Sequence, residues 1–266
     1  MIDLWVSLSA YGGISTRQIL ATFEQAGIRS VELAIGPRLN KDTVQAIVDY
    51  QERGFRYRAH HAFVWGDRHR AFNLADSLVD WSELQARVEW MATIGITEYS
   101  IHAGHYSWNS DREMAYGQFL QNFDRLHALC RSVGIMLGIE TMYPTMKGSG
   151  HCYLLDSRRG IDYFCQDMPE VKLVIDLAHL HIWVEDENEK LGLLDDESRI
   201  LEVHISDNDG QRDLHSRITP NTWWMPWRDR IPKQVPWVLE SRMNQWSADS
   251  LKKEIAQVNQ WFVSSR

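Results

Sequence analysis

Residues 172–176 read KLVID, an apolar run that ends in the carboxylate of Asp176 and is followed by Leu177-Ala178-His179. Four further apolar runs also end in a residue that binds metal ions: Ile101-His102, Ile139-Glu140, Val203-His204 and Leu239-Glu240. A buried strand that finishes in a carboxylate or an imidazole is costly unless that group has a partner. Five such endings, each about one strand–helix unit after the last, indicate one shared site.

Strand-like and helix-like segments alternate along the chain. The strand candidates are Leu4 to Leu8, Ser30 to Ile35, Tyr57 to His61, Glu98 to His102, Met136 to Glu140, Lys172 to Asp176, Ile200 to Ile205 and Pro236 to Glu240. Amphipathic stretches between them include Ser15 to Ala26, Trp81 to Ile94, Arg112 to Val133 and Ser157 to Asp167. A glycine at 27, 54, 95 and 134 follows a helix-like stretch, where a left-handed C-cap is favoured.

Eight strand candidates in this alternation favour a closed (β/α)8 TIM barrel over an open doubly wound sheet. The length of 266 residues suits one such domain spanning residues 1–266. Residues 220–236, rich in Trp and Pro, predict a long loop with a short helical turn. In such barrels the strand ends converge on one face, where catalysis takes place. The sequence therefore predicts an enzyme.

Composition limits which binding partners and which cellular compartment we expect for this protein. The net charge of −8 disfavours nucleic acid as a partner without excluding it. No apolar run approaches the roughly 20 residues that span a bilayer, and no signal peptide is apparent. The three cysteines show no metal-binding or redox spacing, which is typical of structural thiols in a reducing compartment. We expect a soluble, cytoplasmic protein without a membrane partner.

Glu140, Asp176, His204 and Glu240 are the leading candidate metal ligands. Any one of them alone is more often a salt-bridged or capping residue, but four occur at equivalent positions of successive units. Three carboxylates and one imidazole suit a divalent cation, namely Mn²⁺, Co²⁺, Mg²⁺, Fe²⁺ or Zn²⁺. One ion is the leading interpretation, and two or three ions are the alternative.

Two further sets lie at neighbouring strand ends. His60 or His61 and His102 would stand beside Glu140, which can bridge two ions; adjacent histidines point to opposite faces of a strand, so one of the pair should face the interior. The alternative is a packed core or rim histidine. His179, Asp213 and His215 can hold another ion, contact substrate or orient other ligands, or can belong to a solvated turn.

Taken in order, these motifs resemble the xylose-isomerase-like barrel superfamily of sugar isomerases, epimerases and apurinic endonucleases. The resemblance covers nearly the whole chain. It is carried by His60-His61-Ala62-Phe63, His102-Ala103-Gly104, Gly138-Ile139-Glu140, Ile175-Asp176-Leu177-Ala178-His179, His204-Ile205-Ser206-Asp207-Asn208-Asp209-Gly210, Asp213-Leu214-His215 and Leu239-Glu240.

The resemblance implies two competing branches. Epimerases similar to D-tagatose 3-epimerase hold one metal on a set that falls on Glu140, Asp176, His204 and Glu240; there the two glutamates transfer protons and the residue matching His179 contacts substrate. Endonuclease IV holds three zinc ions. Its nine ligands map onto His60 (or His61), His102, Glu140, Asp176, His179, His204, Asp213, His215 and Glu240. A homodimer is a further implication.

The leading hypothesis is a metal-dependent isomerase or epimerase of a small sugar or sugar phosphate. Glu140 and Glu240 would act as base and acid beside a metal-stabilised enediolate. The candidate substrate-binding residues are His179, Arg217, His61, His105, Trp65, Trp223 and Trp224. The alternatives are a multinuclear phosphoester hydrolase, although no basic run suits duplex DNA, and an inactive barrel used for binding. Residues 216–224 replace the family's glycine-rich stretch, which leaves the substrate open in either branch.

Overall fold

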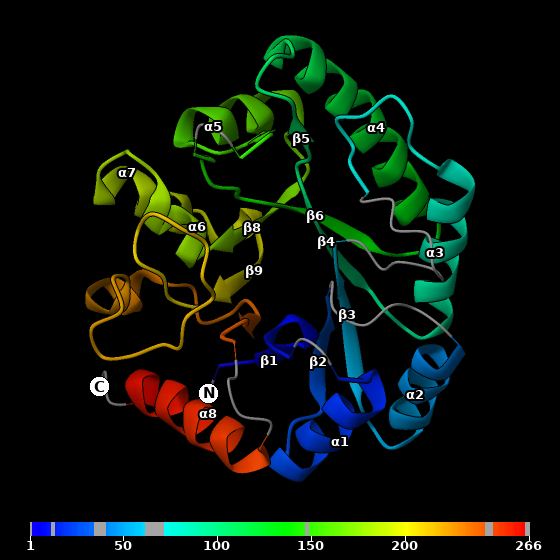
Figure 1. Cartoon of the computed structure of the whole chain (residues 1–266), viewed down its shortest axis with the longest axis vertical. Coiled ribbons are helices and arrows are strands. Elements are labelled where there is room, and N and C mark those ends of the chain that lie inside the picture. Colours follow the sequence, from blue (N-terminus) through cyan, green and yellow to red (C-terminus); the bar gives the residue numbers. More distant parts are fainter. Residues whose placement is uncertain are drawn as a thin grey trace.

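Eight parallel strands close into a barrel at the centre of the molecule (Figure 1). The computed structural model describes residues 2–11, 14–34, 41–61, 72–146, 149–242 and 247–263. Around the barrel the strands follow the order β1-β10-β9-β8-β6-β4-β3-β2. Their bounds are Leu4–Ser7 (β1), Ser30–Leu33 (β2), Arg56–His60 (β3), Glu98–His102 (β4), Met136–Glu140 (β6), Lys172–Asp176 (β8), Ile200–Ile205 (β9) and Trp237–Leu239 (β10). The predicted (β/α)8 barrel is confirmed.

Helices surround the barrel and cover the outer faces of its strands (Figure 1). They are Thr16–Ala26 (α1), Lys41–Glu52 (α2), Trp81–Thr93 (α3), Arg112–Ser132 (α4), Arg158–Asp167 (α5), Leu177–Ile182 (α6), Glu187–Leu191 (α7) and Ala248–Val263 (α8). The strands and helices named from the sequence agree with these bounds or differ by one or two residues at an end. Ile35, the predicted end of the second strand, lies outside the described residues.

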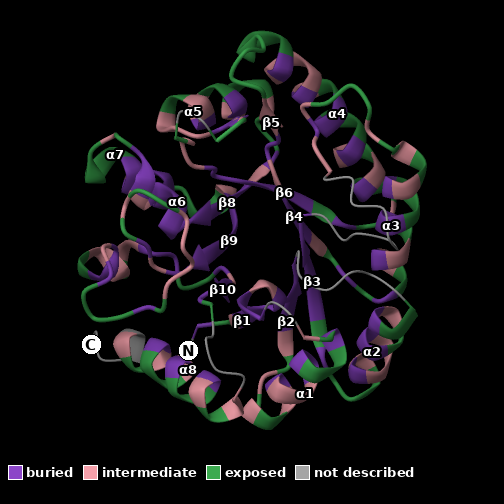
Figure 2. Cartoon of the chain, in the orientation of Figure 1, coloured by how far each residue is buried: buried purple, intermediate pink, exposed green. Residues whose placement is uncertain are grey.

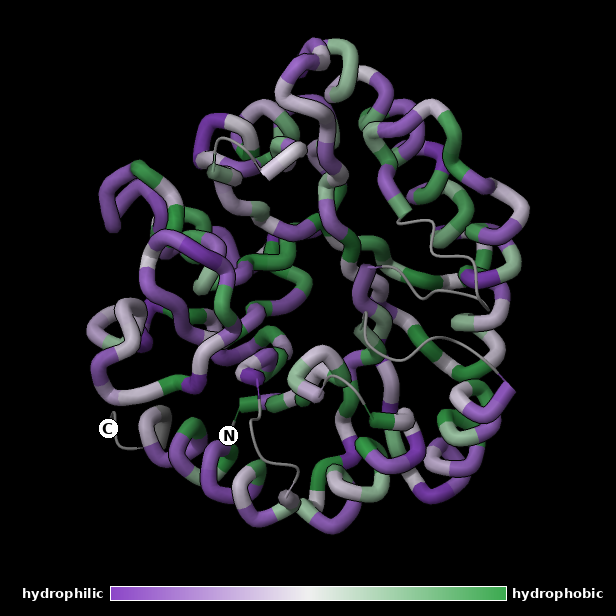
Figure 3. The backbone as a smooth tube through the Cα atoms, in the orientation of Figure 1, coloured by the Kyte–Doolittle hydropathy of each residue, from purple (hydrophilic) through white to green (hydrophobic). Residues whose placement is uncertain are grey.

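The hydrophobic core lies between the strands and the helices (Figures 2 and 3). Residues alternate along a strand, so Ile101, Ile139 and Ile175 face outward. They belong to one buried cluster with Phe119 and Phe123 of α4. Burial of such apolar surface stabilises the fold by roughly 25 cal/mol per Å². The other half of the strand residues faces the barrel interior, and many of those are charged.

Helix ends follow the signals read from the sequence. Ser15 caps α1, because its Oγ accepts the N–H of Gln18 while the Gln18 side chain accepts the N–H of Ser15. The glycines at 27, 54, 95 and 134 have φ between 72° and 86°. In this left-handed region a Cβ atom costs about 1–2 kcal/mol, so glycine lets the chain turn from helix to strand.

Two elements extend the loops at the carboxyl ends of the strands. The short strands β5 (His105–Tyr106) and β7 (Cys152–Tyr153) pair antiparallel, with His105 opposite Tyr153. The helical turn predicted within residues 220–236 is a 3-10 helix, Met225–Arg230. Further 3-10 turns span Leu8–Ala10, Gly192–Asp195 and Glu197–Arg199.

Neither a membrane helix nor a disulfide occurs in the described part of the chain. No helix there is long and apolar enough to cross a bilayer. Cys130, Cys152 and Cys165 are all free thiols. The prediction of unpaired cysteines therefore agrees with the structure.

Candidate metal centre

Six ionisable side chains form a ring inside the barrel, at the carboxyl ends of its strands. They are His60, His102, Glu140, Asp176, His204 and Glu240. The strand register places His102 beside Glu140, and Asp176 beside His204. All except the half-buried His102 are buried. Buried carboxylates in this number are costly unless cations or hydrogen bonds compensate them.

Four members of the ring converge on one point. The ligand atoms of Glu140, Asp176, His204 and Glu240 lie within 4.8 Å of one another. His204 Nδ1 is 3.3 Å from Glu140 Oε1 and 3.4 Å from Glu240 Oε2. His204 Nδ1 and Asp176 Oδ2 are buried without a hydrogen-bond partner. Three carboxylates and one imidazole nitrogen, with unsatisfied atoms among them, fit a divalent cation.

Asp176 is fixed by the start of a helix. It is both the last residue of β8 and the N-cap of α6, and its Oδ1 accepts the N–H of Ala178 at 2.7 Å and of His179 at 3.0 Å. Burial raises the pKa of Asp176 to about 6; His179 opposes this shift, and Glu240 adds to it. A cation beside Oδ2 would favour the charged carboxylate.

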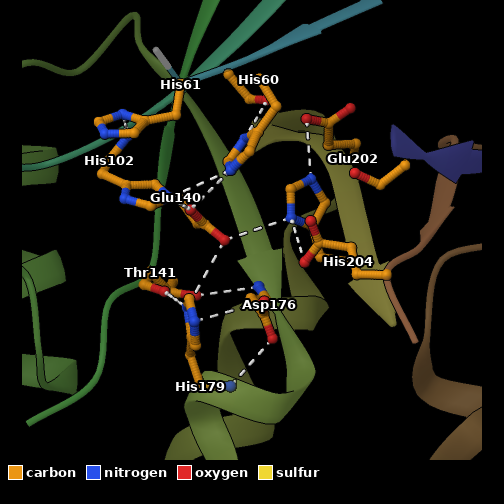
Figure 4. A network of polar contacts seen from close by, with 12 residues as sticks. His60, His61, His102, Glu140, Thr141, Asp176, His179, Glu202 and His204 are labelled. Carbon is orange, nitrogen blue, oxygen red and sulfur yellow. Dashed lines mark hydrogen bonds and ion pairs between the residues drawn. The ribbon is translucent and has the colours of Figure 1, made fainter. Parts of the chain in front are cut away.

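His60 and His61 have different positions, and His60 is the one that faces the interior (Figure 4). His60 Nε2 lies 3.2 Å from His102 Nε2 and 3.6 Å from Glu140 Oε2. His61 adopts a positive φ of 46°, and its ring stacks on His102 with centroids 3.8 Å apart. Its Nδ1 accepts the backbone N–H of His102 at 3.3 Å. His61 therefore packs behind His102, and this predicted substrate-binding residue does not line the pocket over the ring.

Glu140 belongs to two close sets at once, and Figure 4 shows it among the histidines that contact it. His60, His102 and Glu140 form a second group whose ligand atoms lie within 4.8 Å. The shortest of its contacts joins His102 Nε2 to Glu140 Oε2 at 2.9 Å. Burial works against the charged form of Glu140, but His102 and His60 hold the pKa of its carboxyl well below the usual range. The arrangement allows Glu140 to bridge two sites.

His179, Asp213 and His215 lie beside the first set. His179 Nδ1 is 2.7 Å from the carbonyl oxygen of Thr141, to which it donates a hydrogen bond. Its Nε2 lies 3.7 Å from Asp213 Oδ2, which is also 3.0 Å from His215 Nε2. Burial opposes the charged form of His215, but Asp213 and Glu240 raise the pKa of His215 to about 9. Asp213 thus lies between the two imidazoles and is the ion-pair partner of both.

A pocket of about 210 Å³ opens over these side chains. Seven of its lining residues were predicted, namely His60, His102, Glu140, His179, Asp213, His215 and Glu240. The others are Ser9, Ala34, Met142, Tyr143, Tyr153 and Arg242. The rings of Tyr143 and Tyr153 lie 5.2 Å apart, and Tyr143 packs 4.7 Å from His179. The pocket thus has an ionic floor and an aromatic wall.

The aromatic wall consists of tyrosines, not of the predicted Trp223 and Trp224. Trp224 is fully buried and donates from Nε1 to Ser206 O at 3.1 Å. Trp223 stacks on His181 with centroids 5.2 Å apart and donates to Leu177 O. Both indoles thus pack the loop against α6 and β9, and neither of these predicted substrate-binding residues lines the pocket. Nothing in the local sequence of the tyrosines distinguishes them, because β5–β7 pairing brings Tyr153 to the pocket.

Three other residues were predicted to bind substrate, namely Arg217, His105 and Trp65. Arg217 lies away from the pocket, since its Nε is 2.7 Å from Oε2 of the buried Glu254 in α8. An unpaired buried carboxylate is costly, so this ion pair explains the orientation. His105 lies in β5 with its ring 5.0 Å from that of His151, and it does not line the pocket. Trp65 lies outside the described residues, as do residues 62 and 63 of one motif.

A second charged group lies deeper in the barrel and was not selected from the sequence. Glu32, Arg58 and Glu202 are all 0–1% exposed. Arg58 Nε lies 2.5 Å from Glu202 Oε2. Arg58 precedes His60 by two residues and Glu202 precedes His204 by two, a spacing that places each pair on one face of a strand. This alternation becomes a signal for Arg58 and Glu202 only once the closure of the barrel shows that this face of the strands is buried.

Comparison with known proteins settles the family. Residues 20–241 match the family model described as xylose isomerase-like TIM barrel. The chain belongs to this family. Among curated proteins, no sequence matches it. The resemblance read from the motifs is thus confirmed.

Solved structures of this fold superpose over nearly the whole chain. A D-tagatose 3-epimerase-like protein is 15% identical, with a TM-score of 0.73, over 97% of this chain and 99% of its own. D-allulose 3-epimerase from Methylomonas sp. is 16% identical, with a TM-score of 0.72, over 98% of each chain. 3-Keto-D-glucoside 4-epimerase from E. coli is 13% identical, with a TM-score of 0.66, over 98% and 100%. At these identities the likeness shows the fold.

Proposed function

We propose that the protein is a divalent-metal-dependent isomerase or epimerase of a small sugar or sugar phosphate. The observation that carries this proposal is the convergence of Glu140, Asp176, His204 and Glu240 on one point beneath a small pocket. The solved structures of the same fold include several sugar epimerases, which supports the substrate class.

The size and lining of the pocket favour a small polyol. Its volume of about 210 Å³ is below the roughly 300–1,000 Å³ of pockets for drug-sized ligands. Carboxylates, imidazoles and phenol groups offer hydrogen bonds to hydroxyl groups, and the rings of Tyr143 and Tyr153 offer an apolar face. Arg242 is the lining residue suited to a phosphate or a further hydroxyl group.

Glu140, Asp176, His204 and Glu240 would hold the cation. When bound, the ion supplies Lewis-acid stabilisation of the negative charge that develops on a carbonyl oxygen as the adjacent carbon loses a proton. Asp176 is held by its capping hydrogen bonds, and His204 is held through Nε2. Because the protein fixes these two side chains, few rearrangements are needed to complete the site.

Glu140 and Glu240 are the proposed proton-transfer pair. They come from β6 and from the end of β10, with β8 and β9 between them in the barrel order. Both line the pocket, so their carboxylates reach a bound sugar from two sides. Epimerisation needs one group to remove a proton from carbon and another to return a proton on the opposite face. His179 Nε2 would position a hydroxyl group, because its Nδ1 is held by Thr141.

Proton exchange with solvent tests this proposal directly. The protein loaded with Mn²⁺ or Co²⁺ is incubated in D₂O with a panel of ketoses and ketose phosphates, and deuterium at the carbon next to the carbonyl is measured by NMR. We expect exchange with wild type and a loss of roughly 100- to 10,000-fold in Glu240→Gln, because the variant lacks the acid–base group. Asp249→Asn, which removes a carboxylate that is 85% exposed on α8, is the matched control. Absence of exchange across the panel would contradict the proposal.

A multinuclear phosphoester hydrolase is the second candidate, and the His60–His102–Glu140 set favours it. Two or three ions would then clamp a phosphate group between them. Metal content per chain separates the two functions, because the first needs one ion at the Glu140–Asp176–His204–Glu240 set. His102→Ala should remove an ion and abolish cleavage of an abasic duplex in the hydrolase. In the epimerase it should lower kcat/KM by roughly 10- to 100-fold with the metal count unchanged.

A further inference from the structure

Two carboxylates contact Nε2 of His204, on the side of the ring that faces away from the proposed metal site. Glu32 Oε2 lies 3.2 Å from His204 Nε2, and Glu202 Oε1 lies 3.3 Å from the same nitrogen. Glu32 comes from β2, on the opposite side of β1 and β10 from the strand that carries His204. All three side chains are 0–1% exposed. The contact therefore forms across the interior of the barrel, away from solvent.

The two carboxylates differ in their other ion-pair and hydrogen-bond partners. Glu202 is paired with Arg58, whose Nε is 2.5 Å from Glu202 Oε2. Within the described residues, the ion pair of Glu32 is with His204, and neither oxygen of Glu32 has a hydrogen-bond partner, whereas Glu202 Oε1 is hydrogen-bonded to His204 Nε2. A buried carboxylate with so little compensation is costly to the fold. Its contact with His204 is the interaction that accounts for its presence there.

The contact has a chemical consequence for the other nitrogen of the same ring. His204 Nδ1 faces Glu140 and Glu240 at 3.3 and 3.4 Å, on the side of the proposed metal site. An imidazole binds a cation through a nitrogen that carries no proton, so its remaining proton must sit on the opposite nitrogen. A carboxylate that accepts this proton fixes both the tautomer and the orientation of the ring.

We propose that Glu32 is a positioning residue, whose negative charge beside His204 Nε2 keeps the ring proton on that nitrogen and leaves His204 Nδ1 free to bind the metal ion. This inference rests on the metal site of the proposed function, and it names a residue outside the four ligands on which that site depends. Glu202 accepts the hydrogen bond from Nε2, but its charge is shared with Arg58. Glu32 therefore supplies the negative charge at this nitrogen that no arginine compensates.

Metal affinity of the Glu32→Gln variant is the test. Apparent dissociation constants for Mn²⁺ are measured by competition with a chelator, and the number of ions bound at saturation is counted. We expect the dissociation constant to rise roughly 10- to 100-fold with the number of ions unchanged. The absorption bands of bound Co²⁺ should also shift, since the imidazole ligand is less basic without the negative charge of Glu32 beside it. Glu32→Asp keeps the charge but withdraws it by one methylene group, so it should weaken binding as well.

Glu254→Gln is the matched control. Glu254 is 1% exposed and pairs with Arg217, so the same substitution removes a buried charge without touching the proposed site. We expect lower stability and unchanged metal affinity in this variant. Glu32→Gln overturns the inference if it binds Mn²⁺ as tightly as Glu254→Gln does.

Two other outcomes of the metal-binding experiment can be distinguished from these. Loss of one bound ion at saturation would mean that Glu32 is itself a ligand, together with His60 and His204, whose ligand atoms lie within 4.8 Å. That result also overturns the positioning role. Absence of divalent binding in the wild type would appear before any variant is compared. It would reject the proposed function and the inference together.

Discussion

Arg58 carries the cationic charge in the group of buried charges deep in the barrel. Its guanidinium pairs with Glu202, and the strand register places it beside Glu32. In Arg58→Met, Glu202 would remain buried without its cation. We expect a loss of about 3–5 kcal/mol in the free energy of unfolding, measured by urea denaturation.

Arg17→Met provides the comparison for this substitution. Arg17 pairs with Asp49 at 2.7 Å, but the two side chains are 51% and 36% exposed. An exposed pair contributes about 0–1 kcal/mol, so the variant should unfold almost as the wild type does. Equal losses in the two arginine variants would show that water reaches Glu202.

Residues of the candidate site were predictable from the sequence where their type is unusual for the position they occupy. The other residues of the site were not predictable. A histidine or carboxylate that ends an apolar run, such as Asp176, stands out in the sequence. Glu32 and Arg58 resemble ordinary surface charges, because short strands with alternating residues are also typical of sheets with one solvated face. Closure of the barrel turns that face inward, which is a property of the whole fold.

At the scale of elements, α4 contains one glycine and is followed by another, and the two should respond oppositely to alanine. Gly117 lies inside the helix and Gly134 follows its end with φ of 79°. Neither has an atom within 4 Å of where a Cβ would be. Gly117→Ala should stabilise the protein by roughly 0.5–1 kcal/mol, because glycine is a poor helix former. Gly134→Ala should destabilise it by about 1–2 kcal/mol, because of the left-handed backbone.

Thermal or chemical unfolding of these two glycine variants checks the prediction. The substitutions are identical in chemistry, so a difference in sign isolates the backbone conformation. If both variants lost stability, the interior of α4 would depend on Gly117 for a reason other than helix propensity.

The eight barrel strands and the four helices named from the sequence were predictable to within a residue or two, because each of them has local signals. The run at 172–176 is apolar, and Ser15 and Gln18 form a capping box at the start of α1. The loops have no comparable local sequence signals that predict where their side chains lie. Tyr153 lines the pocket because β7 pairs with β5. Trp223 does not line it, because its ring stacks on His181. Both outcomes depend on contacts between segments distant in the sequence.

For the molecule as a whole, pH sensitivity at the alkaline end is expected from a buried thiol. Burial raises the pKa of Cys130 in α4 from 9.0 to about 12. Between these values the folded state keeps a proton that the unfolded state releases, so stability falls as the pH rises above about 9. Below pH 9 both states are protonated, and this group has no effect.

Melting temperatures of wild type and Cys130→Ala between pH 8 and 10 test this expectation. The variant should melt lower at pH 8, because it loses buried volume, but its melting temperature should fall less from pH 9 to 10. Buried tyrosines such as Tyr57 and Tyr99, whose pKa values are also raised, act at higher pH in both proteins. Parallel curves would show that Cys130 does not titrate on unfolding.

Stability and chemistry occupy different layers of this molecule. The apolar layer between strands and helices holds the fold together, whereas the barrel interior contains charges that are costly to bury. Neutral substitutions in the ring, such as Asp176→Asn, should therefore be tolerated by the fold of the metal-free protein while they remove a ligand. Sites that trade stability for activity in this way are the usual pattern in enzymes.

The shared position of Glu140 implies communication between its two neighbouring sets. Its Oε1 faces His204 and its Oε2 faces His102. A cation held at either oxygen withdraws electron density from the whole carboxylate and repels a second cation nearby. Occupation of one set should thus weaken the other, and by thermodynamic reciprocity the two effects are equal. Ion binding at this carboxylate would be anticooperative, so a titration that fills both sets would proceed in two separated steps.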